Sequence, residues 1–309
     1  TVPGNFTPRT LSSAGSFILF HRGRPLLIDS GKCGYDRAEY MDYYVRSRAH
    51  NVVLFDGEGQ PAEDNVRGVK FPGTVQRVVE GEGLRYVRAD ATGPMAHVFS
   101  RNYRHWLWLG RVILVIDDVR AHRDGRFDWL LHYAGEAQAS GDGVRIVNGD
   151  AAARIRFLNP PALERTTERG WDANQPDVER AFLRFSTPTP AREAKFLTAI
   201  VLEEAGQPQP QLELLEGPDF LGVRVTQSDV VVETWLNLLA DGRTAHLNSI
   251  NLCGPWTTDA YLLATIRSAG DAEIDSVLIV DGSLLRKDER SVWESYGKIT
   301  GFTRLKQVR

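Results

Sequence analysis

Cysteine and lysine are both scarce in this sequence. The two cysteines, Cys33 and Cys253, make neither a disulfide framework nor a zinc motif, although a single bridge between them stays open. Nearly all cationic side chains are arginines, because lysine occurs only at positions 32, 70, 195, 287, 298 and 306. Arginine binds carboxylates and sulfates bidentately, so this bias suits an anionic ligand. A GC-rich genome explains the same bias.

Long hydrophobic runs and nucleotide-binding motifs are missing as well. No apolar run approaches the ~18–20 residues needed to cross a bilayer, and the first residues lack a signal-peptide pattern. The net charge of −3 offers no basic excess for nucleic acid. The sequence has no Gly-rich phosphate loop, G-x-S-x-G elbow, H-E-x-x-H or C-x-x-C motif. These absences argue against dinucleotide enzymes, common serine hydrolases and zincins.

Helical periodicity is weak along the whole chain, and only residues 37–46 could form two helical turns, although this tyrosine-rich segment could equally be a loop. Elsewhere, short β-branched or aromatic runs are broken by turn residues about every ten positions. Apolar and polar residues alternate in 126–133 and 181–185, and Asn148-Gly149 is a strong hairpin signal. With 42% apolar residues to build a core, the sequence predicts an all-β fold, a large antiparallel β-sandwich.

Expected strands cover most of the chain, and one stretch separates them into two groups. Residues 206–210 are rich in Pro and Gln, which predicts a seam. We therefore expect a main β-sandwich domain over 1–205 and a smaller C-terminal β subdomain over 206–309, packed on it. The expected strands are 16–20, 25–28, 51–55, 74–80, 84–88, 96–100, 103–109, 111–119, 126–133, 144–147, 152–157, 180–186, 195–203, 211–215, 221–226, 230–236, 246–251, 261–268, 275–280 and 301–305.

Polar side chains gather at strand ends between residues 16 and 60, in connections of the kind where binding sites form. Asp29 ends an apolar strand, so it is either a turn-forming residue or a carboxylate that orients or ligates a partner. His50, followed by Asn51, enters the next strand, where it can carry a proton, ligate a metal or only cap the strand. Four nearby tyrosines offer a phenolic acid or base, a sugar-stacking surface or packing: Tyr35, Tyr40, Tyr43 and Tyr44.

Two further polar positions lie along apolar strands. His132 has apolar neighbours, which predicts a hydrogen-bonded core histidine. Asp117 and Asp118 follow the apolar run 112–116. Paired carboxylates suit acid–base chemistry, and a turn at the end of a strand explains them equally well.

An ordered series of residues in the same region resembles a known family. The series reads GRPLLIDSGK at 23–32, then Gly34-Tyr35, then SRAHNVVLFDG at 47–57. It is similar to the C-terminal β-sandwich of heparinase II/III-type polysaccharide lyases. More diffusely, residues 101–132 and 194–202 resemble the order of strands in that family.

The resemblance implies a reaction and roles for individual residues. In that family the sandwich packs against an N-terminal (α/α) toroid, and the substrate cleft lies between them. The reaction is β-elimination at a uronic acid of an anionic polysaccharide, carried by acid–base catalysis. The catalytic residues implied here are Tyr35 and His50. The substrate-binding residues implied are Arg9, Arg46, Arg48 and Asn51.

The resemblance also implies a zinc site, of which part is missing. Asp29 and His50 match two of three ligands of a structural zinc site found in several members, and such ligands suit Zn²⁺. Family members carry His-x-His-x-Asp shortly before the first of these strands. This sequence has Arg9 and Leu11 in place of the histidines, and leucine cannot ligate a metal. We therefore expect an incomplete zinc site.

The toroid that supplies much of the chemistry is absent from this sequence. We therefore expect the chain to begin partway into a longer protein, to have the toroid as its partner and to be inactive alone. The substrate class favours a periplasmic or secreted protein. The alternative is a non-catalytic glycan-binding or assembly module that keeps the fold and has lost the catalytic and metal histidines.

Overall fold

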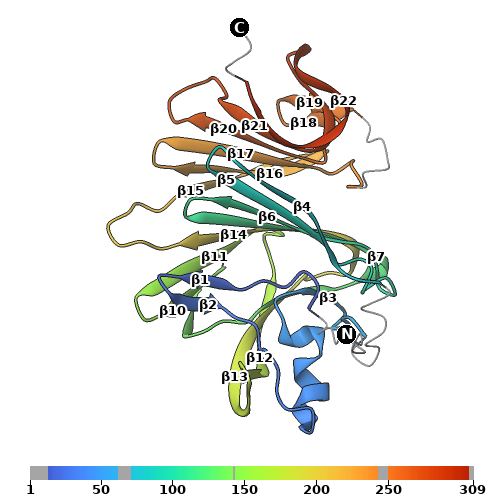
Figure 1. Ribbon diagram of the computed structural model, residues 1–309, viewed down its shortest axis with the longest axis vertical. Coiled ribbons are helices and arrows are strands. Elements are labelled where there is room, and N and C mark those ends of the chain that lie inside the picture. Colours follow the sequence, from blue (N-terminus) through green and yellow to red (C-terminus); the bar gives the residue numbers. More distant parts are fainter. Residues whose placement is uncertain (1–12, 62–70, 142, 243–249, 306–309) are drawn as a thin grey trace, which may run out of the picture. The chain divides into compact units, whose positions relative to one another are not determined.

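The computed structural model describes residues 13–61, 71–141, 143–242 and 250–305. Figure 1 shows that most of them form β-strands, and the strands pair antiparallel, as the sequence predicts. The chain divides into two compact units. The first consists of Thr1–Gln76, Val87–Leu107 and Arg111–Glu204, and the second of Arg77–Tyr86, Trp108–Gly110 and Ala205–Arg309. The division at 205 and 206 into separate domains stays a prediction.

The first unit is built on a β-sandwich. Its larger sheet has eight strands in the order β4 (Thr74–Gly81), β5 (Leu84–Asp90), β6 (Phe99–Leu109), β7 (Val112–Gly125), β14 (Ala191–Leu202), β11 (Ala151–Asn159), β10 (Gly143–Asn148) and β9 (Glu136–Ser140). Of these strands, residues 77–81 of β4, 84–86 of β5 and 108–109 of β6 are assigned to the second unit. Its smaller sheet has the order β12 (Glu164–Asp172), β13 (Gln175–Ser186), β8 (Phe127–Leu131) and β3 (Val53–Phe55). A separate two-stranded sheet pairs β1 (Leu19–His21) with β2 (Arg24–Leu27).

Alternation along the strands of the smaller sheet separates two apolar clusters. Phe127 and Trp129 on β8 belong to the main core, together with Val115 of the larger sheet. Leu130, the residue after Trp129, belongs to a second cluster with Tyr44. Successive side chains of a strand point to opposite faces, so β8 contributes to both clusters. The predicted alternation in 126–133 is confirmed.

The second unit has its own sheet and core. Its strands are β15 (Gln211–Gly217), β16 (Phe220–Gln227), β17 (Val230–Asn237), β18 (Asn251–Cys253), β19 (Trp256–Thr258), β20 (Leu262–Ser268), β21 (Ser276–Lys287) and β22 (Arg290–Arg304). Trp235 and Trp256 meet edge-to-face, with ring centroids 6.4 Å apart, in the core of this unit. Cys253 is buried beside them as a free thiol, and Cys33 is free as well.

Several predicted strands were wrong in extent or missed. Residues 96–100 were expected to form their own strand, but turns occupy 92–98 and Phe99 begins the long strand β6. The strand β12 was missed because its sequence, ERTTERGWD, is polar and mostly exposed at the edge of its sheet. The expected strand 246–251 lies largely outside the described residues.

Within the described parts of the chain, helical structure is confined to the segment between β2 and β3. Tyr40–Tyr44 form a π-helical turn and Ser47–Ala49 a 3₁₀ turn. The prediction for 37–46 left a short helix or a loop open, and this segment contains only one wide helical turn. Its buried residues, Tyr43 and Tyr44, fix it on the outer face of the smaller sheet through the second cluster.

Candidate functional site

Asp29 lies two residues after the end of β2, where the chain turns toward the tyrosine-rich segment. Its Oδ1 accepts a hydrogen bond from the Gly31 backbone N–H at 2.7 Å, and its Oδ2 lies 2.7 Å from His50 Nδ1. Gly31 has a φ of +70°, a left-handed conformation that glycine adopts without strain. Asp29 therefore forms the turn with one oxygen and orients the histidine with the other.

The Asp29 carboxyl is ionised at neutral pH. Burial by itself raises its pKa, but the hydrogen bond and charge of His50, with the Gly31 N–H, outweigh burial and hold the pKa below its usual value of 3.8. An ionised carboxylate only accepts hydrogen bonds, so His50 Nδ1 is the donor in this contact. In the neutral tautomer that has this proton on Nδ1, the lone pair for proton transfer or ligation is on Nε2.

His50 is fully buried at the entry to β3. Its backbone N–H donates to Ser47 O at 3.1 Å and closes the 3₁₀ turn. Among the residues that the structure describes, Nε2 of His50 has no hydrogen-bond partner. A buried polar atom without a partner is costly and points to a role other than packing.

Asn51 connects three segments through its side chain. Its Nδ2 donates to Phe17 O at 2.8 Å and to Ile28 O at 2.9 Å, and its Oδ1 accepts from the His132 backbone N–H at 2.6 Å. Both amide hydrogens are therefore used inside the protein, and the side chain is fully buried. These bonds position His50 by holding its neighbour. The predicted contact of Asn51 with substrate stays a prediction.

The four tyrosines divide into a buried pair and a peripheral pair. Burial raises the pKa of Tyr43, whose hydroxyl lies 3.1 Å from Ser30 Oγ, and raises the pKa of Tyr44 to about 12. Both act in packing. Tyr35 is 59% exposed and meets Tyr40 edge-to-face, with ring centroids 4.8 Å apart. Tyr35 is accessible to a ligand, and its catalytic role stays a prediction.

The predicted arginines lie in the same segment. Arg46 Nε donates to Met41 O at 2.8 Å, which ties it to the π-helical turn. Arg48 is exposed, and its Nη2 donates to Arg169 O on β12 at 3.3 Å. Arg9 lies outside the described residues. The substrate contacts of all three arginines stay predictions.

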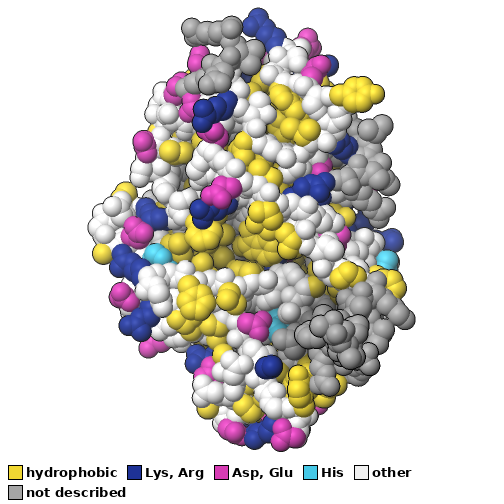
Figure 2. Space-filling model, in the orientation of Figure 1, with side chains coloured by type: hydrophobic (Ala, Val, Ile, Leu, Met, Phe, Trp, Pro, Cys, Tyr) yellow, Lys and Arg dark blue, Asp and Glu magenta, His cyan; other side chains and the backbone are white. Residues whose placement is uncertain are grey.

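Many other arginines of the first unit are paired with carboxylates. Glu203 binds both Arg145 Nη2, at 2.8 Å, and Arg154 Nη2, at 3.0 Å. On the face shown in Figure 2, basic and acidic side chains are interspersed. Part of the positive charge that the sequence offers to an anionic ligand is therefore already neutralised within the protein.

The predicted zinc ligands form a hydrogen-bonded pair. Two ligands at ~2.0 Å from one tetrahedral zinc lie about 3.3 Å apart, whereas Asp29 Oδ2 and His50 Nδ1 are 2.7 Å apart. Among the described residues, no group of three or more His, Cys, Asp or Glu side chains is placed to hold a metal. Asp29 Oδ2 and His50 Nδ1 are therefore placed to share a hydrogen bond and not a common zinc, and Leu11 lies outside the described residues. The metal role of Asp29 and His50 stays a prediction.

Asp117 and Asp118 serve neither of the roles proposed for them, because β7 continues past both. Asp117 is buried in the sandwich, where it accepts from Arg104 Nε at 2.5 Å and Trp129 Nε1 at 2.8 Å. Asp118 is equally buried and pairs with Lys195 Nζ at 2.5 Å. Both carboxylates are therefore parts of buried ion pairs.

His132 is a buried histidine, and its packing explains its titration. Its ring stacks on Phe182 with centroids 4.4 Å apart, and its Nδ1 lies 3.3 Å from Asn51 Oδ1. Burial, with a smaller effect of the neighbouring His50, lowers the pKa of His132 to about 3. His132 is therefore neutral in the folded protein.

The titration of His132 predicts a loss of stability in acid. The unfolded state binds a proton with a pKa near 6.5, so the contribution of His132 is complete above that pH and is lost progressively as the pH falls toward 3. We expect His132→Asn, which keeps a donor near Asn51 Oδ1, to reduce the slope of unfolding free energy by about 1.4 kcal/mol per pH unit between pH 6 and 4. Urea unfolding at several pH values measures this, and equal slopes in both proteins would contradict it.

One element of the site was missed by sequence reasoning. The tip of the β12–β13 hairpin reaches the segment that follows Asp29, where Asp172 O accepts from Tyr44 Oη at 2.8 Å. Asn174, in the turn, has a φ of +60°. The only local signal was the Asp-Ala-Asn sequence, whose residue types favour turns. Because the strand before this turn, β12, is polar, the sequence did not predict a hairpin here.

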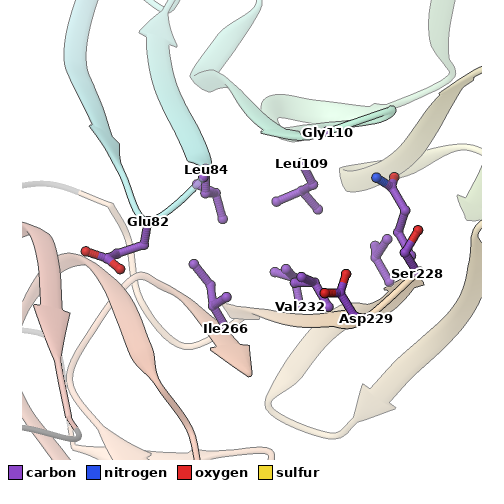
Figure 3. Close-up of a pocket in the computed structure, with 12 residues that line it drawn as sticks. Glu82, Leu84, Leu109, Gly110, Ser228, Asp229, Val232 and Ile266 are labelled. Carbon is purple, nitrogen blue, oxygen red and sulfur yellow. The ribbon is translucent and has the colours of Figure 1, made fainter. Parts of the chain in front are cut away.

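The second unit has a pocket of about 290 Å³ (Figure 3). Leu84, Leu109, Val232 and Ile266 give it apolar walls, and Asp229 lies at its edge. Its described lining includes no aromatic ring, histidine or arginine. Anionic sugars are bound mainly by such groups, so this pocket does not match the expected ligand.

Comparisons with known proteins agree with this fold. Among the described residues, no helix has the length and apolarity needed to span a membrane. A search of curated proteins finds no match. The solved structure of a mutant of heparan sulfate lyase HepC from Pedobacter heparinus is similar to this chain. The two share 16% sequence identity, with a TM-score of 0.59. The alignment covers 74% of this chain and 37% of that one.

A second solved structure, of heparinase III, shares 15% identity with a TM-score of 0.56 over 70% of this chain and 34% of that one. This chain thus spans little more than a third of either solved chain. At such identities the likeness establishes the fold. The family described as Heparinase II/III-like, C-terminal, matches residues 8–211, which is more than half of the chain. The chain therefore belongs to the heparinase II/III-like C-terminal family.

Proposed function

We propose that this chain is the β-sandwich part of a polysaccharide lyase that cleaves a uronic-acid-containing anionic polysaccharide by β-elimination. The observation that carries the proposal is the oriented Asp29–His50 pair, which lies inside the stretch that matches the family. The solved structures that resemble the chain include a heparan sulfate lyase. The cleft would lie between the sandwich and a toroid contributed by a preceding segment.

The reaction assigns a task to four of the side chains implied by the resemblance. Arg46 and Arg48 neutralise the uronate carboxylate, which makes the proton on C5 more acidic. A base removes that proton, the C4–O4 bond breaks, and a C4–C5 double bond forms while an acid protonates O4. His50, with its lone pair on Nε2, and Tyr35, with its exposed phenol, are the two groups of this chain that carry the proton steps.

A second candidate is a glycan-binding or assembly module without activity. The observation that favours it is the complete burial of His50, because a base must reach the proton that it removes. A loss of the two histidines that the family carries near positions 9 and 11 points the same way. Such a module would keep the arginines of the segment and bind the polymer without cleaving it.

Absorbance of the unsaturated uronate product separates the two candidates. The full-length protein is incubated with heparan sulfate, heparin, alginate and, as an uncharged control, dextran. We expect product from at least one uronate and none from dextran. Binding without product would support the non-catalytic module, and neither binding nor product on any uronate would contradict both candidates. The 309-residue chain alone is expected to give no product, because the proposed cleft needs a toroid as its other wall.

The substrate class also suggests a location. Polysaccharides of this size are met outside the cytoplasm, so we place the protein in the periplasm or among secreted proteins. Fractionation of the native host with an antibody against this chain tests the location. Recovery in the cytoplasm alone would contradict it.

A further inference from the structure

The tip of the β12–β13 hairpin is hydrogen-bonded to the turn that follows Asp29. Asn174 donates its backbone N–H to Ser30 O at 3.1 Å, and its Oδ1 accepts from the Lys32 backbone N–H at 3.0 Å. A β-carbon at Gly31 would collide with the Asn174 side chain, so the two segments are in close contact there. Three consecutive residues, 30–32, are thus held by one asparagine that is 142 positions away from Lys32.

A single peptide group connects this contact to the Asp29 carboxylate. The peptide between Ser30 and Gly31 offers its carbonyl oxygen to Asn174 and its N–H to Asp29 Oδ1, at 2.7 Å. Because the peptide is planar, fixing the direction of its C=O also fixes the direction of its N–H. By holding Ser30 O, Asn174 therefore fixes the direction in which the Gly31 N–H points at Asp29 Oδ1. Asp29 Oδ2 in turn holds His50 Nδ1.

The hairpin tip is itself anchored. Arg180 Nε donates to Asp172 Oδ1 at 2.5 Å, and the Ala173 N–H donates to the same oxygen at 2.8 Å. Tyr44 Oη donates to Asp172 O on the other side. The salt bridge between Arg37 and Asp177, at 2.5 Å, adds a further link between the hairpin and the tyrosine-rich segment. The tip can therefore act as a fixed support.

We infer that Asn174 is a positioning residue for the Asp29–His50 pair. It acts through the Ser30–Gly31 peptide and touches neither substrate nor the reacting atoms. The inference rests on the proposed function, since it deepens the account of the same site. The side-chain oxygen of Asn174 holds the Lys32 N–H, which keeps the 30–32 turn against the Asn174 backbone N–H. The inference therefore predicts that the orientation of His50 depends on a side-chain oxygen at position 174.

Three variants separate positioning from turn stability. Asn174→Gly keeps the left-handed conformation and removes the side-chain acceptor. Asn174→Asp keeps an oxygen acceptor for the Lys32 N–H, and aspartate tolerates the same conformation. Ser228→Gly is the matched control, because Ser228 has a φ of +53° in the β16–β17 turn of the second unit.

The primary readout is the imidazole of His50 by ¹⁵N NMR, which requires no activity. In Asn174→Gly we expect the Nδ1–H to exchange with solvent about tenfold faster, as for a weakened hydrogen bond. Asn174→Asp is expected to stay within twofold of the wild type, and Ser228→Gly to leave the signal unchanged. In the full-length protein, Asn174→Gly is also expected to lower kcat about tenfold, with a smaller change in KM.

The outcomes that contradict the inference are specific. An unchanged His50 signal in Asn174→Gly would overturn it, as would an Asn174→Asp variant that behaves like Asn174→Gly. If the wild-type protein cleaves no uronate, the proposed function fails, while the ¹⁵N signal still decides whether Asn174 positions the pair. Equal losses of thermal stability in Asn174→Gly and Ser228→Gly, with a changed signal only in the former, would support positioning.

Discussion

Replacing Asp117 by alanine is expected to lower the free energy of unfolding of the first unit by about 3–5 kcal/mol. Asp117 is 1% exposed and accepts hydrogen bonds from Arg104 Nε and Trp129 Nε1. Arg104 is also buried and donates to Gly15 O and Asn51 O as well. Removing the carboxylate leaves a buried guanidinium without its counter-charge and a buried indole N–H without an acceptor. Urea unfolding measures the loss.

Two further variants test the cause of that loss. Glu193 is a largely exposed carboxylate that lies 3.7 Å from Lys195 Nζ, so Glu193→Ala is expected to cost less than about 1 kcal/mol. The double change Arg104→Met with Asp117→Leu removes both charges and is expected to recover part of the stability lost in Asp117→Ala. A loss below about 1 kcal/mol in Asp117→Ala would show that the pair contributes little.

Replacing His50 by alanine in the full-length protein is expected to lower kcat by about 10²–10⁴-fold. His50 is one of the two groups of this chain proposed for the proton steps, and Asp29 holds its ring by the 2.7 Å hydrogen bond. Asp29→Asn is expected to lower kcat in the same direction, because an amide can donate to Nδ1 and favour the wrong tautomer. Initial rates of unsaturated uronate formation measure both effects.

His122→Ala is the control for His50. His122 lies in the same unit, is exposed, and its Nε2 lies 3.0 Å from the Ala96 backbone oxygen, so its loss is expected to leave kcat unchanged. Binding of an uncleaved oligosaccharide is expected to change less than kcat does in His50→Ala. A His50→Ala protein that keeps more than half of its kcat would remove this residue from the mechanism.

Much of the fold was predictable because its signals are local. The alternation in 126–133 and the Asn148-Gly149 turn identify strands and a hairpin without knowledge of any contact. The polar strand β12 was not predictable in this way, since an exposed edge strand needs no apolar face. Residues 164–172 form a strand because they pair with β13. The sequence of β12 alone does not predict that pairing.

The residues of the candidate site could be predicted from the sequence, but the hydrogen bonds that hold them in place could not. Asp29 and His50 stood out because they end and begin apolar strands, and the structure joins them by a hydrogen bond. Nothing local indicated that Asn51 would use its amide to join two backbone carbonyls, or that Asn174 would hold the turn after Asp29. Such roles depend on partners that are distant in sequence.

The sequence by itself determined the all-β class, most of the strands and the family, because periodicity, turn residues and an ordered motif are properties of the chain alone. Only the tertiary structure decided the state of the polar residues. It placed Asp117 in a buried ion pair instead of a turn, and gave Asp29 both of its expected roles at once. The reason is physical: burial and hydrogen-bond partners, which set charge and orientation, arise only when distant strands pack together.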